Sequence, residues 1–148
     1  MKKITIIGLL AAIIIACVLL LRYHAEISKA RDEAFRERLA GVWLRAEDYL
    51  PRGVGTALSM RCTNTVAADG SFVELSWFRH SDRTNTYQRT GTWLVKDGRL
   101  IETVKTSTNP TEVIPHSDAG RIISADALVF AVRWQNSTNE TIWQRVAK

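Results

Sequence analysis

The amino-acid sequence predicts an all-β domain: a small antiparallel up-and-down barrel or meander of about eight strands, preceded by an N-terminal transmembrane helix and a helical stalk. From Gly41 onward, short runs rich in Val, Ile, Thr, Trp and Phe alternate with turn-forming residues at a spacing of about 8–12 residues, which is typical of antiparallel β proteins. Residues 4–21 carry no charge, and residues 23–40 contain neither Gly nor Pro. We therefore divide the chain into an anchor or signal segment at residues 1–22, a helical stalk at 23–40 and a β domain at 41–148.

The uncharged run at residues 4–21 follows Lys2 and Lys3. A helix of eighteen residues, at a rise of about 1.5 Å each, spans most of a hydrocarbon core of about 30 Å, so we expect an uncleaved signal anchor. The alternatives are a cleaved signal peptide and a lipoprotein signal, because Ile-Ile-Ala-Cys at residues 14–17 resembles a lipobox in which Cys17 would be lipidated. Lys2 and Lys3 favour a cytoplasmic N-terminus, which places the β domain on the periplasmic or extracellular side of a single-pass membrane protein.

The predicted stalk at residues 23–40 is rich in Ala, Glu, Arg and Lys, which are good helix formers, and it has only a broken apolar stripe. This composition indicates a solvated spacer that lifts the β domain away from the lipid headgroups, and not a coiled coil. Phe35 and Leu39 lie close to its end, and we expect them to plug the end of the β domain.

Eight strands are expected in the β domain, because eight short β-rich runs are separated by turn-forming residues. They lie at residues 42–45, 60–67, 71–78, 86–95, 100–105, 121–124, 128–134 and 141–146. A barrel of this size has an interior barely wide enough for its own side chains or for one small ligand.

The pair Asp97-Gly98 lies between two alternating runs and predicts a β-hairpin with a two-residue type I′ turn, because both residues tolerate positive φ angles. Pairing outward from this turn gives three inward-facing pairs, Val95 with Leu100, Trp93 with Glu102 and Gly91 with Val104. Arg89, two places beyond the last of these pairs, is expected to face inward as well.

The pair Asp69-Gly70 carries the same signal and predicts a second two-residue turn. Its inward-facing pairs would be Val66 with Val73, Asn64 with Leu75 and Cys62 with Trp77. Cys62 has no partner cysteine within the β domain, so we expect it to be a small apolar core residue.

Glu102 is the strongest indication of a ligand site. A buried carboxylate costs several kcal/mol unless it is paired, protonated or placed in a wet cavity. The sequence therefore predicts a ligand-binding site formed by Arg89, Glu102, Asn64 and Trp77. The alternative is that Glu102 lies near a barrel mouth, or that a β-bulge turns it to solvent.

Five short motifs occur in an order that resembles the lipocalin-like domain of bacterial envelope proteins, within the wider calycin group. They are Gly41-Val-Trp43, Asp69-Gly-Ser-Phe72, the Gly-Thr-Trp-Leu-Val-Lys-Asp-Gly-Arg-Leu at residues 91–100, the run at residues 122–129, and Trp143-Gln-Arg145. In lipocalins a Gly-x-Trp on the first strand closes the base of the barrel, and an Arg on the last strand packs over that Trp. The resemblance implies these barrel-closing roles for Gly41, Trp43 and Arg145.

Several classes of function are not indicated. Residues 41–148 carry 13 Lys and Arg against 11 Asp and Glu, and a net charge of +2 is too small for a nucleic-acid surface. His24, His80 and His116 are scattered, so no metal site is expected. The chain has no Gly-rich phosphate loop and no Gly-x-Ser-x-Gly. We therefore predict that the protein is not an enzyme and has no cofactor and no catalytic residue.

Two functions follow as expectations. The first is a membrane-tethered lipocalin-like domain that binds a small apolar or amphipathic ligand in the cell envelope. The alternative is a non-catalytic module that interacts with an envelope protein or has a structural role there. A cavity above about 300 Å³ with convergent polar groups would favour the first, and a packed interior with an exposed apolar patch would favour the second.

Overall fold

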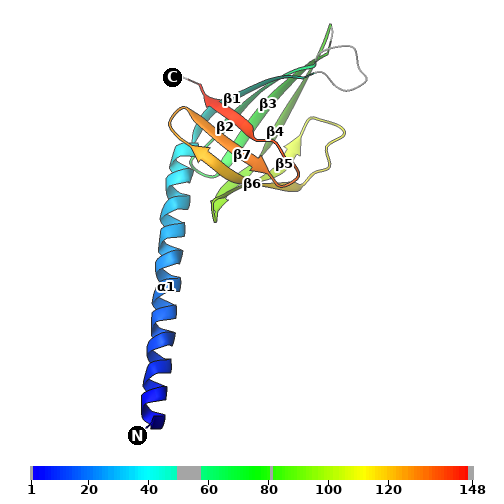
Figure 1. Cartoon of the computed structure of the whole chain (residues 1–148). Coiled ribbons are helices and arrows are strands. Elements are labelled where there is room, and N and C mark those ends of the chain that lie inside the picture. The colour runs from blue at the N-terminus through cyan, green and yellow to red at the C-terminus, as the bar shows by residue number, and fades with distance from the viewer. Residues whose placement is uncertain (1, 50–57, 81, 147–148) are drawn as a thin grey trace.

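The computed structural model describes residues 2–49, 58–80 and 82–146, with the backbone alone for residues 2–11 and Tyr49. Within these residues, one helix, α1 (Lys2–Leu39), precedes eight antiparallel strands (Figure 1). The strands are β1 (Gly41–Tyr49), β2 (Leu58–Val66), β3 (Ser71–His80), β4 (Arg83–Lys96), β5 (Arg99–Ser107), β6 (His116–Ala125), β7 (Val129–Trp134) and β8 (Thr141–Arg145). Each strand pairs with the next, and β8 pairs with β1, so the barrel is closed.

The predicted antiparallel barrel is therefore confirmed, and each of the eight predicted strands is present. Several strands are longer than the sequence indicates. The clearest case is β6, which begins at His116 rather than near Arg121. Its first residues are His-Ser-Asp, without apolar alternation, and they become a strand because they pair with the second half of β5. Pairing with a neighbouring strand extends β structure beyond the residues whose own pattern predicts it.

The predicted membrane-crossing helix is not found in the described part of the chain. No helix there is long and apolar enough to cross a membrane. The predicted run at residues 4–21 lies partly outside the described side chains, because these begin at Ala12. From Ala12 the apolar residues continue only to Leu21, and Arg22 follows.

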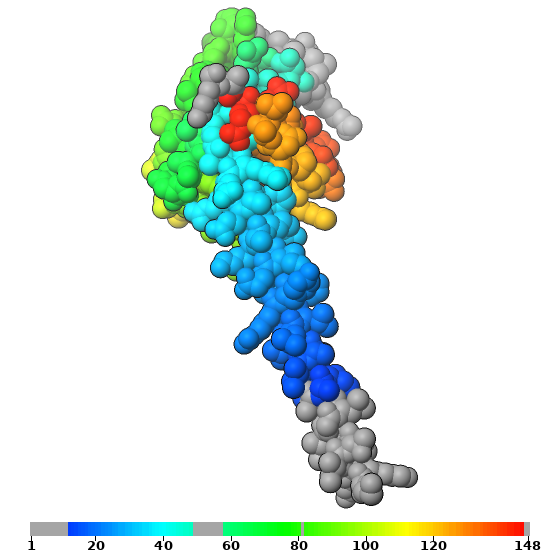
Figure 2. All heavy atoms as spheres, turned by 90° about the vertical axis from the view of Figure 1, so that its left-hand side faces the viewer, coloured from blue at the N-terminus to red at the C-terminus, as the bar shows by residue number. Residues whose placement is uncertain are grey.

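The C-terminal end of α1 packs against one end of the barrel, while most of the helix stands clear of it (Figures 1 and 2). The carboxylate of Asp32 accepts hydrogen bonds from the backbone amides of Asp97, at 2.6 Å, and Gly98, at 2.8 Å. Leu39 is buried in the barrel core, and Phe35 packs against that core, as predicted. The last turns of α1 are thus part of the domain, and the prediction of a free spacer over residues 23–40 does not hold for them.

The carbonyl groups at the end of α1 receive hydrogen bonds from the barrel. The indole N–H of Trp43 donates to the Leu39 carbonyl at 2.7 Å. The guanidinium of Arg145 donates to the Ala40 carbonyl at 3.2 Å and also to the carbonyl of Arg38. A helix leaves its last carbonyls without partners inside the helix, and a cation is favourable at that end because of the helix dipole. The first and last strands of the barrel therefore cap α1.

Arg145 also lies over the ring of Trp43, with its guanidinium carbon 4.3 Å from the ring centroid. Trp43 and Arg145 are directly opposite each other on β1 and β8, so the predicted stack and the predicted meeting of first and last strands are both present. Gly41 allows this close approach, since a β-carbon there would lie 2.5 Å from a guanidinium nitrogen of Arg145. The three residues close the barrel at the end that faces α1.

The predicted type I′ turn at Asp97-Gly98 is confirmed by positive φ angles of 53° at Asp97 and 71° at Gly98. The register that follows from it is confirmed too, and Trp93 lies opposite Glu102. A register shift next to Gly91 follows further along β4, and beyond it Arg89 is still partly buried.

Replacing Gly98 with Val is expected to lower the free energy of unfolding by about 1 kcal/mol or more, because a β-branched residue is strained at positive φ. A β-carbon at Gly98 would also lie 3.3 Å from the guanidinium of Arg31, which would have to move. Urea unfolding followed by circular dichroism measures the change. Gly98→Asn is the matched control, because Asn tolerates this conformation better. Equal midpoints for Gly98→Val and wild type would contradict the strain.

The predicted register of the other hairpin is wrong by one residue. Val66 pairs with Phe72 instead of Val73. The turn has three residues rather than two, because Ala67 and Ser71 are still paired and the Gly70 amide donates to the Ala67 carbonyl at 3.1 Å. A type I turn followed by a glycine at positive φ is the usual form of a three-residue hairpin loop. Since side chains alternate along a strand, this slip exchanges the two faces of β3.

Candidate functional site

The interior of the barrel changes from apolar to polar along its axis. Large apolar side chains, including Trp43, Phe72 and Phe130, fill the end next to α1. Toward the opposite end, which we call the distal end, the buried side chains include Asn64, Glu74, Ser76 and Glu102. Their strands carry them inward at every second residue, so the polar cluster is a direct result of the register.

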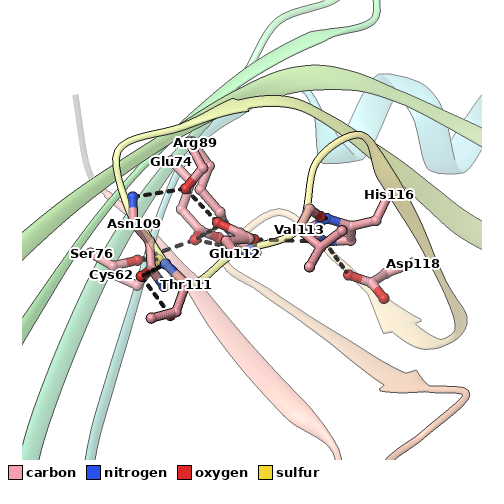
Figure 3. Close-up of polar contacts among 11 residues, drawn as sticks. Cys62, Glu74, Ser76, Arg89, Asn109, Thr111, Glu112, Val113, His116 and Asp118 are labelled. Carbon is pink, nitrogen blue, oxygen red and sulfur yellow. Dashed lines mark hydrogen bonds and ion pairs between the residues drawn. The ribbon is translucent and has the colours of Figure 1, made fainter.

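Arg89 lies between two carboxylates at the distal end (Figure 3). Its Nε and Nη2 donate to one oxygen of Glu74, at 2.8 and 2.5 Å, and its Nη1 donates to Glu112 at 3.2 Å. Ser76 donates a further hydrogen bond to the same Glu74 oxygen at 3.1 Å. Burial disfavours the charge of Arg89, but the two carboxylates outweigh that effect and raise its pKa. The guanidinium is thus held in one orientation.

Glu112 comes from the loop between β5 and β6 and joins the cluster to β6. Burial raises the pKa of Glu112, but hydrogen bonds from Ser107 and Arg89 outweigh this effect and lower the pKa below its usual value. The His116 ring lies on its other side, with Nε2 3.6 Å from Glu112 and 3.3 Å from Asp118. Figure 3 shows this chain of polar contacts from Glu74 through Arg89 and Glu112 toward Asp118.

Glu102 differs from the other carboxylates because it forms no ion pair within the described residues. It is only 9 % exposed, and it lies directly opposite Asp118 on the neighbouring strand. Burial, and next the charge of Glu74, raise the pKa of Glu102 to about 7, while Arg89 acts in the opposite direction. At neutral pH this carboxyl group is therefore close to half protonated.

Asn64 lies beside Glu102 and is only 1 % exposed. Its Oδ1 atom is buried and has no hydrogen-bond partner among the described residues. A buried amide oxygen without a partner costs about 1–3 kcal/mol, so the polar cluster is incomplete at this point.

Two cavities at the distal end have Arg45, Glu74 and Arg89 in common. One has a volume of about 170 Å³ and is lined by residues of β2, β3 and β4, among them Cys62 and Tyr87. The other has a volume of about 270 Å³. Its remaining lining is formed by Glu102, Asp118, Trp134, Asn136, Ser137 and Trp143. We call it the Glu102 cavity.

The structure brings three of the four predicted ligand-site residues together, since Asn64, Arg89 and Glu102 all belong to the polar cluster. Trp77 does not belong to it. It lies on the outer face of β3, because the slip of one residue in the first hairpin directs Glu74 and Ser76 inward in its place. A three-residue turn at Asp69-Gly70 would have predicted that Glu74, and not Trp77, faces the interior.

Glu112, Asp118 and the two cavity tryptophans were not predicted. Glu112 lies in a loop, where no periodicity indicates a direction. Asp118 lies in the part of β6 that has no apolar alternation. Among the described residues, no group of three or more His, Cys, Asp or Glu side chains is placed to hold a metal ion.

Cys62 is buried in the polar part of the barrel rather than among purely apolar residues. Its sulfur lies 3.3 Å from the hydroxyl oxygen of Ser76, which can accept a weak hydrogen bond from the thiol. Burial and the nearby charge of Glu74 raise the pKa of Cys62 to about 12. The thiolate is the reactive form, so Cys62 is expected to be inert at neutral pH.

In a Cys17→Ser chain, iodoacetamide at pH 8 is expected to leave Cys62 unmodified while the protein is folded, and to modify it fully in urea. Cys17 is removed because it is exposed. Mass spectrometry of the intact protein measures the modification. Modification in the folded protein at the rate of a free thiol would show that Cys62 is neither buried nor shifted in pKa.

No protein-family model and no curated protein sequence matches this chain.

Proposed function

We propose that the protein is a lipocalin-like binding barrel that takes a small amphipathic ligand through its distal end. The Glu102 cavity carries this proposal, because charged groups and tryptophan side chains converge on one half-open cavity. Small-molecule sites combine such apolar walls with a few fixed polar groups. The order of sequence motifs and the closed antiparallel barrel support the lipocalin-like type.

The size of the cavity limits the ligand. Sites for drug-sized molecules have volumes of about 300–1,000 Å³. At about 270 Å³, the Glu102 cavity is slightly below that range. Arg89 is already held by its two carboxylates, so a ligand would meet polar groups that need little rearrangement, and this lowers the entropy lost on binding. We therefore propose a ligand smaller than a typical drug molecule.

Filling the cavity tests the proposal. Small molecules are screened by their effect on the thermal unfolding temperature of the wild-type protein, and hits are repeated on Ser137→Trp, which places an indole at the cavity lining. Thr138→Trp is the matched control, because the neighbouring residue is not part of the lining. We expect hits to stabilise wild type and Thr138→Trp but not Ser137→Trp. A screen without hits, or hits that Ser137→Trp still binds, would contradict binding in this cavity.

We also propose that the N-terminal segment attaches the barrel to a membrane, with the barrel on the periplasmic or extracellular side. The support is the uncharged sequence at residues 4–21 after Lys2 and Lys3. In a bacterial host the full chain is expected in the membrane fraction after a carbonate wash, and a chain that begins at Tyr23 in the soluble fraction. Palmitate incorporation that Cys17→Ser abolishes would instead support a lipoprotein. Recovery of the shorter chain with the membrane would contradict attachment through the N-terminal segment.

A second candidate function is docking of an envelope protein to the outer face of the barrel. Val42 and Leu44 on β1 and Ile142 and Val146 at the end of the chain are all exposed. They form one strip, because the Val146 amide donates to the Val42 carbonyl and β1 pairs with β8 at Leu44. An exposed apolar strip is a usual feature of interaction surfaces. Cavity-filling substitutions would leave docking intact, whereas Leu44→Lys would abolish it.

A further inference from the structure

We propose that the Glu102 cavity takes a small organic cation, with an ammonium group between the carboxylates of Glu102 and Asp118 and its carbon skeleton against Trp134 and Trp143. This inference rests on the proposed ligand-binding function and defines the chemistry of the ligand. It follows from the charges that line the cavity, from the state of its two arginines, and from its aromatic wall.

The two arginines of the cavity are already occupied. Arg89 is held by Glu74 and Glu112, as described above. Arg45 makes two hydrogen bonds of 2.8 Å to the two carboxylate oxygens of Glu47. Both guanidinium groups thus have carboxylate partners. An anionic ligand would have to displace one of these partners before it could bind.

By contrast, two carboxylates of the cavity have no arginine or lysine partner among the described residues. Glu102 and Asp118 lie directly opposite each other on β5 and β6, and both line the cavity. Like charges at directly opposed positions of a sheet repel each other. Glu102 has no ion pair among the described residues, and Asp118, whose side chain is 49 % exposed, contacts only the His116 ring among the basic side chains there. A positive charge between the two carboxylates would remove this repulsion.

The walls of the cavity favour an organic cation over a hydrated metal ion. Trp134 and Trp143 form its aromatic side. Trp143 is held in place by a parallel stack on Phe130, with ring centroids 5.9 Å apart and planes 8° apart. Tryptophan faces attract ammonium groups through their quadrupole and also pack against alkyl chains. Carboxylates beside tryptophans are therefore matched to an alkylammonium ion.

A second observation comes from a side chain beside Glu102 that is not itself part of the cavity lining. The buried Oδ1 atom of Asn64, which lies next to Glu102, has no partner within the described residues. It can accept a hydrogen bond but cannot donate one. An N–H donor brought to this part of the barrel would suit it, whereas a carboxylate or phosphate would add a further acceptor to a group of acceptors.

Binding of a cation is expected to depend on pH. The groups that face Glu102 are Glu74 from β3, Arg89 from β4 and Asp118 from β6. With the pKa of Glu102 at about 7, its proton must leave before an ammonium group can pair with the carboxylate. Raising the pH from 6 to 8 increases the ionised fraction about tenfold, so the affinity should rise by a similar factor.

The experiment compares three probes of the same length: n-butylammonium, n-butanol and n-butyrate. Each is titrated into the protein while the indole N–H signals are followed by nuclear magnetic resonance, which measures weak binding. We expect n-butylammonium to bind at least tenfold more tightly than the other two at pH 8. Glu102→Gln should reduce this affinity about tenfold or more and remove most of its pH dependence. Glu140→Gln is the control, because this exposed carboxylate pairs with Arg133 and does not line the cavity.

The outcomes separate this inference from the proposed function. Tighter binding of n-butyrate or n-butanol than of n-butylammonium would contradict the inference that the ligand is a cation. The proposal that the cavity binds a ligand would stand. Equal affinity of n-butylammonium for wild type and Glu102→Gln would overturn the role of Glu102. No saturable binding of any of the three probes would overturn the cation inference. If the thermal screen also gave no hits, the proposed function would fail with it.

Discussion

Replacing Trp43 with Ala is expected to lower the free energy of unfolding by about 3–5 kcal/mol, which is the usual range for a fully buried tryptophan. Trp43 is 0 % exposed. Its ring meets Phe130 edge to face, with centroids 4.6 Å apart, and carries Arg145 on its face. The substitution would leave a cavity at the end of the barrel and would also remove the donor to the Leu39 carbonyl. The loss therefore affects both the core and the junction with α1.

Urea unfolding followed by circular dichroism measures this effect. Trp77→Ala is the matched control, because it removes the same side chain from the partly exposed outer face of β3. We expect the control to lose far less stability. Trp43→Phe keeps an aromatic ring but has no N–H group, so its loss should lie between the two. A loss for Trp43→Ala no larger than that for Trp77→Ala would show that Trp43 does not close the barrel.

Replacing Glu102 with Gln is expected to stabilise the protein at pH 8 by about 3 kcal/mol and to have little effect at pH 4.5. The pKa of Glu102 is raised from 4.5 to about 7 in the folded state. Between these values the folded protein binds more protons than the unfolded chain, so wild-type stability falls as the pH rises from 4.5 to 7 and is constant above. A difference of about 2.5 pKa units corresponds to about 3 kcal/mol.

The measurement is the free energy of unfolding of both proteins at pH 4.5, 6 and 8. The pKa of Glu112 is lowered in the folded state, so the stability that its carboxylate contributes is lost only at more acidic pH. Cys62 titrates well above the measured pH range. Glu140→Gln is the control and should leave the pH profile unchanged. Parallel pH profiles for wild type and Glu102→Gln would contradict the unpaired state of the buried carboxyl group.

The two hairpins show how far local sequence determines the register. Both contain Asp-Gly, and in both the dipeptide predicts a two-residue turn. At Asp97-Gly98 the rule holds, and it places Glu102 correctly inside the barrel. At Asp69-Gly70 the turn includes one more residue, with Ser71 held by the Asp69 side chain at 2.8 Å, and every assignment on β3 is reversed. A dipeptide indicates that the chain turns, but not how many residues the turn contains.

The polar cluster shows a second limit to what local sequence predicts. Alternation along β5 predicts that Glu102 faces inward, and the desolvation of a carboxylate predicts that it needs a special environment. Neither argument identifies its neighbours. Asp118 and Glu112 reach the cluster through pairing with β6 and through a loop, which are contacts over long sequence distances. Such contacts depend on the closed barrel as a whole and are not encoded by any local pattern.

Hydrogen bonds at the end of α1 fix the barrel to the last turns of the helix. Asp32 holds the turn at Gly98, while Arg145 holds the last helical carbonyls. The direction in which the distal end points is therefore determined by the length of the helix that precedes the junction. Each residue inserted into the exposed stretch at 22–27 would turn the barrel about the helix axis by about 100° and shift it by about 1.5 Å. Helix length thus sets both the direction in which the distal end points and its distance from the start of the helix.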